Sequence, residues 1–447
     1  MASVTDVVSA QIEKVRNKLE TYFESSDQIS GLIKKAGDDK VQVSRYLYRI
    51  PLQLYRGGTF TKYVADGGAF ATGSGMKISH LTAGYFNTDL AYKITDEQQE
   101  TSGASAQSAV NVFQKTLADA MVEAQVIDDI AFHTDGSGKL TGASSAKPSG
   151  TQLTFAGNTD YLGVGRLREG MYVDVWDSAG ANKRANGPYK IETIDYGNKI
   201  VTFASAPTGL TSTDLLAFAG MDAYGPATLV GNSSTWPGGG TTSASGLTGD
   251  SFRHGFPYAN DATTSNYYLG RLKSSMPQLM PTAVNASSSG LVFQHVNLVL
   301  DGIVQRRDKD VVKGLIGIAH MAQRTQVFNI GIAISNWQRG GSDKSIDVMP
   351  SNLGYDQTFD VCGVPCHISK RADRSRLDFI NPKNWGRVQT HDTKFKEVGG
   401  QTVFPVRDAN GALNAAVEFH IIQGYDFVCY DPGAAGYCYG LSLPTGY

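Results

Sequence analysis

The stretch Ala104-Ser-Ala-Gln-Ser-Ala-Val-Asn-Val-Phe113 opens the part of the chain that decides the fold; it continues through Asp128-Asp-Ile-Ala-Phe-His133 to Asp135-Gly-Ser-Gly-Lys-Leu-Thr-Gly142. Apolar residues recur at the three- and four-residue spacing of one helix face, at Val110, Phe113, Leu117, Met121, Ala124, Ile127 and Ala131. No Gly or Pro interrupts the run. The pattern therefore predicts a helix over 107–133, a rod of roughly 40 Å at 1.5 Å per residue.

The glycines that follow predict how this helix ends. Gly136 supplies the left-handed backbone that terminates helices, and Gly138 keeps the next turn tight. With Gly142 they form a spacing that partly matches a dinucleotide-binding fingerprint, but that fingerprint follows a strand and this one follows a helix. A helix cap and rigid turn is the better interpretation.

Composition and charge limit the classes of protein that fit. The net charge of the 447 residues is -2 and only 18% of them are charged, so no general positive field draws the chain to nucleic acid or to a membrane. No run of about 18 apolar residues occurs, and the N-terminus lacks a basic start and an apolar core. We therefore expect no membrane span, no signal peptide, and synthesis in a cytoplasm where the four cysteines stay reduced.

The N-terminal part has an amphipathic helix pattern over 5–36, which packs either on its own domain or on a neighbouring subunit. Residues 41–55 alternate as strands do, and Pro51 indicates an edge or a bulge. Residues 56–94 predict a long hairpin with strands at 59–64 and 90–94. Because an isolated two-stranded arm is marginal in water, we expect it to lie on a partner subunit.

The remainder alternates between strand-rich and mixed regions. Short strands within 151–220 predict a small inserted β-barrel or sandwich with a hairpin corner at 195–198, and 231–265 has the composition of an extended loop. Helices are expected at 291–307 and 324–330, and strands at 314–319, 359–362, 365–368, 378–382 and 417–430.

No motif identifies a catalytic site. No Gly-x-Ser-x-Gly elbow occurs, and adjacent Asp128 and Asp129 on a helix point to different faces, so they cannot work as a paired acid and base. Glycosidase carboxylates cannot be recognised from spacing, so that class stays open. Cys362-x-x-x-Cys366-His367 lacks the second half of a zinc site. We predict no catalytic residue, no cofactor and no metal.

Basic residues cluster at 305–309 and 370–376, interspersed with acids. A solvated surface is the favoured interpretation over nucleic-acid contact, and interface salt bridges are a further possibility.

The order of these parts resembles the major capsid protein of tailed bacteriophages, the Johnson-fold coat protein family. An N-terminal arm precedes a long hairpin at 56–94, and the long helix ends in a turn similar to that family's Gly-Asp-Gly-x-Gly-x-x-x-Gly. Val361-Cys-Gly363-Val-Pro365-Cys-His-Ile368 is similar to its Gly-x-Pro-Val element. The resemblance covers about two thirds of the chain. The sequence departs from the pattern at His133-Thr134, at Cys366 in place of Val, and in the insertion.

The resemblance implies an α+β fold with an arm, an extended β-hairpin loop, a long spine helix, peripheral and axial domains, and an inserted small β domain. The implied units are an N-terminal arm (1–54), the hairpin loop (55–95), a peripheral part with the spine helix (96–150), the insertion (151–230), a loop returning to the core (231–290), an axial domain (291–358) and an axial and peripheral sheet with the C-terminal segment (359–447). The spine helix and the sheet around 361–368 would form the peripheral domain.

The implied function is structural, without enzymatic activity. Copies would assemble as hexamers and pentamers into an icosahedral shell around double-stranded DNA, in the virion of a phage made in bacterial cytoplasm. Expected partners are further copies, a portal and a scaffolding protein, with weak non-specific DNA contact and no membrane; a decoration protein is left open. Structural turn residues would be Gly136, Gly138, Gly142, Gly363 and Pro365. Candidate intersubunit contacts are Arg56, Lys62, Asp66, Lys77, Asp89 and Lys93.

A second hypothesis remains beside the capsid one. The strand-rich insertion carries Tyr172, Trp176 and Tyr189, residue types that suit a carbohydrate-binding phage tail or surface protein. Such a protein would more often be built from β-repeats without a 40 Å helix, so the long helix favours the capsid subunit.

Overall fold

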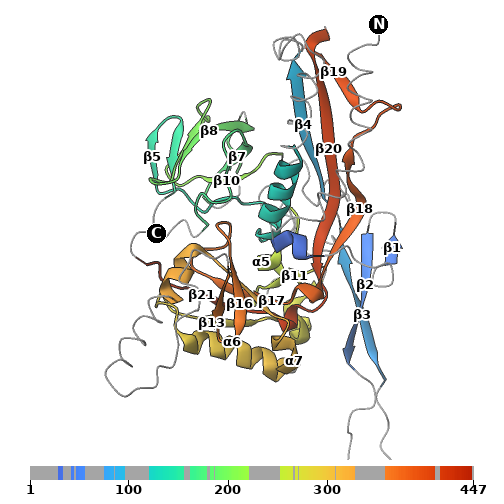
Figure 1. Ribbon diagram of the computed structural model, residues 1–447, viewed down its shortest axis with the longest axis vertical. Helices are drawn as coiled ribbons and strands as arrows, with labels where there is room; N and C mark the ends of the chain where they lie inside the picture. Colours follow the sequence, from blue (N-terminus) through green and yellow to red (C-terminus); the bar gives the residue numbers. More distant parts are fainter. Residues whose placement is uncertain are drawn as a thin grey trace, which may run out of the picture.

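The structure is a computed structural model of the chain. It describes residues 29–33, 42–44, 47–55, 75–84, 86–95, 120–155, 162–178, 182–185, 187–220, 252–264, 267–269, 271–307, 309–327, 358–407 and 413–444. These residues form an α+β fold in which strands outnumber helices (Figure 1). No helix among them is long and apolar enough to cross a membrane.

One unit is a six-stranded sheet covered by α6 (Phe293–Arg306), with the short α7 (Lys309–Val312) following it. The strands run in the order β13 (Thr282–Asn285), β21 (Gly436–Tyr439), β17 (Leu377–Ile380), β14 (Ile316–Ala319), β16 (Val364–Ile368) and β15 (Thr358–Val361). The buried face of α6, Val296, Val299, Leu300 and Ile303, packs with apolar side chains of this sheet. The predicted helix, the buried strand and the β15–β16 pair are confirmed.

The sheet shows which strands the segment 361–368 joins. Gly317 of β14 pairs with Cys366 of β16 in parallel, so residues 361–368 belong to the sheet that α6 covers. They do not pair with the strands beside the spine helix. The sequence gives no local signal for this parallel pairing, because the long segment between β14 and β16 separates the two strands.

A second, longer sheet is built around β20 (Leu413–Cys429). On one side β20 pairs with β18 (Trp385–Phe395) and β19 (Val403–Arg407), and on the other with β4 (Phe86–Thr95), all antiparallel. Beside this sheet lies the C-terminal part of the predicted spine helix, which is helical over 120–132 (Figure 1). Its earlier residues lie outside the described part of the chain.

The predicted hairpin has different strands from those expected. β1 (Gln42–Ser44), β2 (Leu47–Tyr55) and β3 (Lys77–Ala83) form a three-stranded sheet in which β3 pairs with β2. β4, which contains the expected second strand 90–94, pairs instead with β20. The expectation failed because sequence order pointed to a partner within the hairpin, whereas the partner of β4 lies more than 300 residues away. The other expected strand, 59–64, lies outside the described residues.

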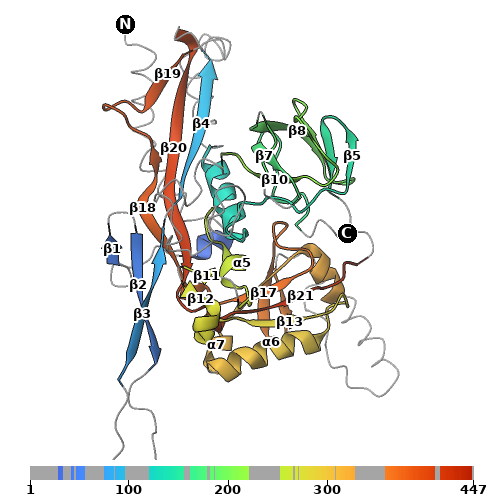
Figure 2. The ribbon, with the colours of Figure 1, turned by 180° about the vertical axis from the view of Figure 1, so that it is seen from behind.

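Both views show β2 and β3 continuing past the end of the long sheet (Figures 1 and 2). Pro51 pairs with His80, beyond the short stretch 47–49 that β1 covers. It therefore lies on a free edge of β2 within the described residues, where the missing N–H costs no ladder bond. Of the predicted helix 5–36, only 29–33 is described, as the 3-10 helix η1 (Ile29–Leu32), and Ile33 packs in the main core of the same chain.

The insertion forms a six-stranded antiparallel sheet, as the sequence predicts, although it begins slightly earlier. The strand order is β10 (Leu215–Phe218), β7 (Tyr172–Trp176), β8 (Tyr189–Asp195), β9 (Ile200–Phe203), β6 (Gln152–Thr154) and β5 (Ala146–Ser149). Its buried residues include Val173, Ile191, Val201 and Phe203. The corner at 195–198 is confirmed, since Asp195 accepts the backbone N–H groups of Gly197 and Asn198, both at 3.0 Å.

The segment 252–264 corrects the prediction of an extended loop over 231–265. It contains α5 (Phe256–Ala259) and buries Phe252, Arg253 and Phe256 in the core. The loop prediction rested on the Gly- and Ser-rich residues before it, which lie outside the described residues. The remaining short elements are β11 (Tyr267–Tyr268), β12 (Arg271–Leu272), and the 3-10 helices η3 (Lys273–Ser275), η4 (Pro277–Leu279), η5 (Pro382–Asn384) and η6 (Pro432–Ala434). The predicted helix at 324–330 is described as helical over 321–327.

Candidate functional site: a buried polar junction at the spine helix

The glycine turn fastens the end of the spine helix to two other parts of the molecule. Gly136 and Gly138 have φ of +82° and +73°, the left-handed backbone that the sequence predicts for the turn. The Gly136 carbonyl accepts the Phe252 N–H at 2.7 Å, and the Gly138 carbonyl accepts the Phe218 N–H at 3.1 Å. The turn thus joins the helix to the segment before α5 and to strand β10 of the insertion. Gly142, also expected as a turn residue, does not have a left-handed backbone.

Arg253 is the centre of a polar cluster near this turn, and its side chain is fully buried. One guanidinium nitrogen donates to Tyr425 Oη at 2.7 Å and to Asp128 Oδ1 at 3.3 Å. The other donates to Thr88 Oγ1 at 2.7 Å. The guanidinium also lies 3.7 Å from the centroid of the Tyr425 ring, a cation–π geometry. Arg253 therefore links the spine helix, β4 and β20.

Asp128 of the spine helix receives the remaining contacts of this cluster. Arg387 of β18 donates to Asp128 Oδ2 at 3.2 Å, and the Tyr425 hydroxyl donates to Asp128 Oδ1. Burial raises the pKa of Asp128 to about 6, against the opposing pull of Arg387 and Arg253. Burial also lowers the pKa of Arg253 to about 10, so it stays a cation at neutral pH.

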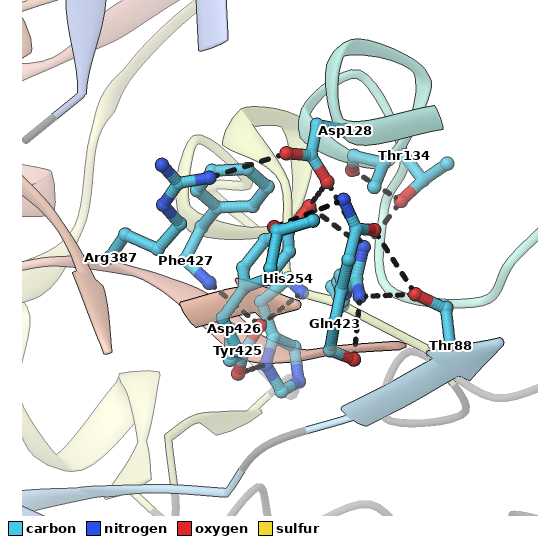
Figure 3. Close-up of polar contacts among 12 residues, drawn as sticks. Thr88, Asp128, Thr134, His254, Arg387, Gln423, Tyr425, Asp426 and Phe427 are labelled. Carbon is cyan, nitrogen blue, oxygen red and sulfur yellow. Dashed lines mark hydrogen bonds and ion pairs between the residues drawn. The ribbon is translucent and has the colours of Figure 1, made fainter. Parts of the chain in front are cut away.

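A second pair extends the cluster along β20. Asp426 Oδ1 accepts the backbone N–H groups of His254 and Phe427, both at 2.8 Å. Asp426 Oδ2 lies 2.6 Å from His254 Nδ1 (Figure 3). With the Arg253 contacts, this fixes two consecutive side chains of the 252–254 segment onto the long sheet.

Asp129, which points to a different face of the helix from Asp128, ties another region of the chain to the helix. Arg371 forms an ion pair with the Asp129 carboxylate, and Arg166 donates to the carbonyls of His133 and Arg371, both at 2.8 Å. Burial lowers the pKa of His133 to about 4, so its ring is neutral at pH 7. The two adjacent aspartates face different partners, as predicted, and each holds a separate part of the fold against the helix.

The expectation of a solvated surface holds for only part of the basic clusters, since Arg306, Lys309 and Lys370 are exposed whereas other members pair with carboxylates. Arg371 pairs with Asp129, and Arg376 pairs with Asp378 of β17 at 2.6 Å. Arg307 pairs with Asp431 at 2.6 Å. These three arginines are largely covered and bind carboxylates of their own chain, two of them distant in sequence and one, Asp378, only two residues from its arginine.

The Val361–Ile368 element forms a tight hairpin. Cys362 and Gly363 both have left-handed backbone, with φ of +52° and +78°, as a two-residue turn between β15 and β16 requires. Pro365 is exposed on β16, opposite Asp360. Cys366, Cys429 and Cys438 are buried, and burial raises the pKa of the Cys366 thiol to about 12. Among the described residues, no group of three or more His, Cys, Asp or Glu could hold a metal ion.

The candidate intersubunit residues are spread over separate elements. Arg56, Lys62 and Asp66 lie outside the described residues. Lys77 is exposed on β3, whereas Asp89 and Lys93 lie on β4 of the long sheet. Asp89 contacts His420 of the same chain at 2.9 Å, and Lys93 stands opposite Glu418 in the strand register. Asp89 and Lys93 are therefore not part of the hairpin, which corrects their expected place.

Sequence reasoning did not find the residues of the junction itself. The sequence places Arg253 and His254 in an expected loop and Tyr425 and Asp426 in an expected strand, and it gives no expectation for Arg387. The available signal was the aromatic-rich run Phe252-Arg-His-Gly-Phe-Pro-Tyr258, whose Pro257 suits the first turn of a helix. Nothing local indicates which carboxylates face those cations.

Comparisons with known proteins give structural neighbours only. No family model matches the chain, and no curated protein matches its sequence. The chain is similar to a protein in the cyanophage A-1(L) capsid asymmetric unit, with 10% identity over 92% of each chain and a TM-score of 0.45. It is similar to one in the capsid of a native GTA particle, with 10% identity over 94% of each chain and a TM-score of 0.42. It is also similar to a protein in the asymmetric unit of the bacteriophage PhiM1 mature capsid. The identity is 9%, the match covers 93% of this chain and 87% of that chain, and the TM-score is 0.42.

Proposed function

We propose that this chain is the major capsid protein of a tailed phage. Copies assemble as hexamers and pentamers into an icosahedral shell that encloses double-stranded DNA. The single observation that carries the proposal is the β2–β3 extension, which leaves the body of its own subunit. Its base packs in the core and its far end is exposed, so the far end is available for contact with another molecule.

The base of the extension is part of the main core. Leu81 and Ala83 of β3 and Ile50 of β2 are buried, and the Tyr48 hydroxyl donates to the Gln389 carbonyl of β18 at 2.9 Å. Toward the other end of β3, Met76 and Ile78 are 54% and 59% exposed. A two-stranded ribbon with exposed apolar side chains is marginal in water. A neighbouring subunit is the partner that the sequence resemblance implies for this ribbon.

The polar junction suits a structural role. Asp128, Asp129 and Asp426 are buried and paired with cations or hydrogen-bond donors of their own chain. Such carboxylates serve to fix elements in one arrangement, which a subunit needs when many copies must fit together. In this proposal the spine helix and long sheet form the peripheral part, and α6 with its sheet lies toward the capsomer centre.

Other expectations follow from the same proposal. The protein works in the virion, without enzymatic activity, after synthesis in the bacterial host. A portal and a scaffolding protein are its further partners, and contact with packaged DNA is weak and non-specific. The low overall charge supports this last point, since tight DNA binding needs many basic phosphate contacts.

The test is assembly of the full chain expressed with its neighbouring genes, followed by negative-stain microscopy and light scattering. The chain is expected to give uniform hollow polyhedra, or capsomer rings that build them. Ile78→Asp should leave a folded subunit that no longer closes shells, because it places a charge on the exposed ribbon. Thr193→Asp, an exposed strand position on β8 of the insertion, is the matched control and should assemble normally. A monodisperse monomer or trimer under all assembly conditions would reject the proposal.

A further inference from the structure

An open groove of about 680 Å³ lies between the long sheet, the spine helix and the insertion. Its walls come from β4, from the helix at 120–132, and from residues 168–172 and 196 of the insertion. This volume is within the roughly 300–1,000 Å³ of small-molecule sites. We propose that the groove binds an oligosaccharide of neutral sugar units. The proposal does not depend on capsid assembly, because all of its residues lie in one subunit.

Three tyrosines make the groove suitable for sugar rings. Tyr172 and Tyr196 of the insertion are 56% and 55% exposed, although both are large apolar rings. Tyr92 of β4 is held by stacking on Phe419, with ring centroids 5.4 Å apart and an interplanar angle of 15°. One face of a pyranose carries C–H groups, which pack on the electron-rich face of an aromatic ring. Rings from two separate sheets can therefore contact successive sugar units.

The charged residues of the groove provide hydrogen-bonding groups for sugar hydroxyls. Glu123 of the spine helix and Arg168 form an ion pair whose side chains remain 31% and 41% exposed. Glu169 is held at the edge of the groove because its Oε1 accepts the Ile194 N–H at 3.1 Å. Carboxylates accept hydrogen bonds and a guanidinium donates them, so together they match a hydroxyl, which does both.

The net charge of the groove favours neutral over acidic sugars. Glu123 and Glu169 contribute two negative charges and Arg168 one positive charge, which leaves one net negative charge along the walls. Acidic sugars would be repelled, whereas neutral and N-acetylated sugars carry no penalty. A peptide is a poorer match, because only Leu90, Ala91 and Met171 supply aliphatic surface and a bound peptide relies on apolar side chains in pockets.

The structure also changes which aromatic residues of the insertion can take part. Trp176 and Tyr189, which suggested carbohydrate binding in the sequence, are both only 4% exposed and belong to the core. Tyr172 alone of that group reaches the surface. Tyr196 and Tyr92 line the groove instead of Trp176 and Tyr189.

The test uses the full chain with cellohexaose, maltohexaose and chitohexaose as neutral probes and a hyaluronan hexasaccharide as the acidic one. Binding is measured by calorimetry and by ligand-observed NMR. At least one neutral probe is expected to bind, and the acidic probe is expected to bind more weakly or not at all. The double variant Tyr172→Ala/Tyr196→Ala should weaken binding of the neutral probe at least tenfold, with an unchanged melting temperature.

Tyr439→Ala is the matched control, since Tyr439 is a partly exposed tyrosine on β21 of the α6-covered sheet, and it should bind like the native chain. The proposal is overturned if no neutral probe binds, or if the double variant binds as well as the control. It is also overturned if the double variant loses association between copies of the chain while no sugar binds, which would assign the groove to a subunit contact. Failure to form shells would leave the binding result standing, so the two proposals fail separately.

Discussion

The core beneath α6 and the polar junction beside the spine helix are both buried, but the first consists of apolar side chains and the second of charged and polar ones. Beneath α6 the contacts are made by Val296, Val299 and Ile303 against Leu377 and Phe379, all apolar. At the junction the buried groups include a guanidinium, two carboxylates and an imidazole. Apolar packing is non-directional and tolerates small shifts, whereas each charged group must meet its partner in one geometry.

This difference separates stability from specificity. A buried ion pair adds little net stability, because desolvation offsets attraction, yet removing one partner leaves a charge uncompensated. The junction therefore acts less as a source of stability than as a constraint. It allows one arrangement of the spine helix, β4, β18 and β20, and it penalises any other.

The largest effect is expected from Arg253→Ala. This change removes the cation that bridges Asp128, Thr88 and Tyr425, and it leaves their polar groups buried with fewer partners. We expect a loss of about 3–5 kcal/mol in the free energy of unfolding, measured by urea denaturation of the full chain.

Val299→Ala is the matched change beneath α6, where the side chain is fully buried. Removing two methyl groups there should cost only about 2 kcal/mol. Equal losses of stability at both sites would contradict the proposed difference between the apolar core and the polar junction. Adding Asp128→Asn to Arg253→Ala should restore part of the stability, because the neutral amide no longer needs a cation, and this recovery would support the difference.

A pH effect of intermediate size is expected from Asp128→Asn. The pKa of Asp128 is raised by burial from 3.8 to about 6, so as pH rises through this window the unfolded chain ionises first and the carboxyl lowers stability. The pKa of His133 is lowered by burial from 6.5 to about 4, so as pH falls through that window the unfolded chain is protonated first and stability is also lost. In the native chain the two groups therefore change the free energy of unfolding in opposite directions as the pH changes.

In Asp128→Asn the carboxyl no longer contributes, so the titration of His133 alone determines how stability changes with pH over this range. The variant should lose stability on acidification between pH 6 and 4 more steeply than the native chain, by up to about 1.4 kcal/mol per pH unit. Urea unfolding at several pH values across this range measures the slope. Parallel curves for the two proteins would contradict the assignment of a raised pKa to Asp128.

The smallest effect is expected from Gly136→Ala in the turn that leads to the junction. Its φ of +82° places a Cβ in the left-handed region, which costs about 1–2 kcal/mol for residues other than glycine. Gly150→Ala, at the β5–β6 turn, is the control, since no atom lies within 4 Å of its added Cβ and its φ is not left-handed. Thermal melting compares the two, and an equal change in melting temperature would show that the left-handed backbone is not the cause.

Local patterns in the sequence were enough to place many elements. The helix at 293–306 follows from its 3.6-residue apolar period, and the β15–β16 hairpin follows from Gly363 between two short apolar runs. The insertion was recognisable from closely spaced strands and the Asp195 turn. In each case the signal lies within the helix, strand or turn that it specifies.

The strand partners were not predictable in the same way. β4 was expected to complete a hairpin, yet it pairs with β20, and the sequence did not indicate that β16 pairs in parallel with β14. Alternation shows that a strand has two different faces, but it carries no information about which edge meets which strand. Pairing across more than 300 residues is decided by the packing of the whole fold.

By itself, the sequence determined the described part of the spine helix, 120–132, with its glycine turn, the α6 helix and the strand-rich insertion, because backbone propensity and apolar periodicity act between near neighbours. Only the tertiary structure decided that Arg253 faces Asp128, that His254 faces Asp426, and that Tyr92 shares a groove with Tyr172 and Tyr196. The physical reason is that a charge or a ring shows no preference for a distant partner until burial removes water and leaves one partner within reach.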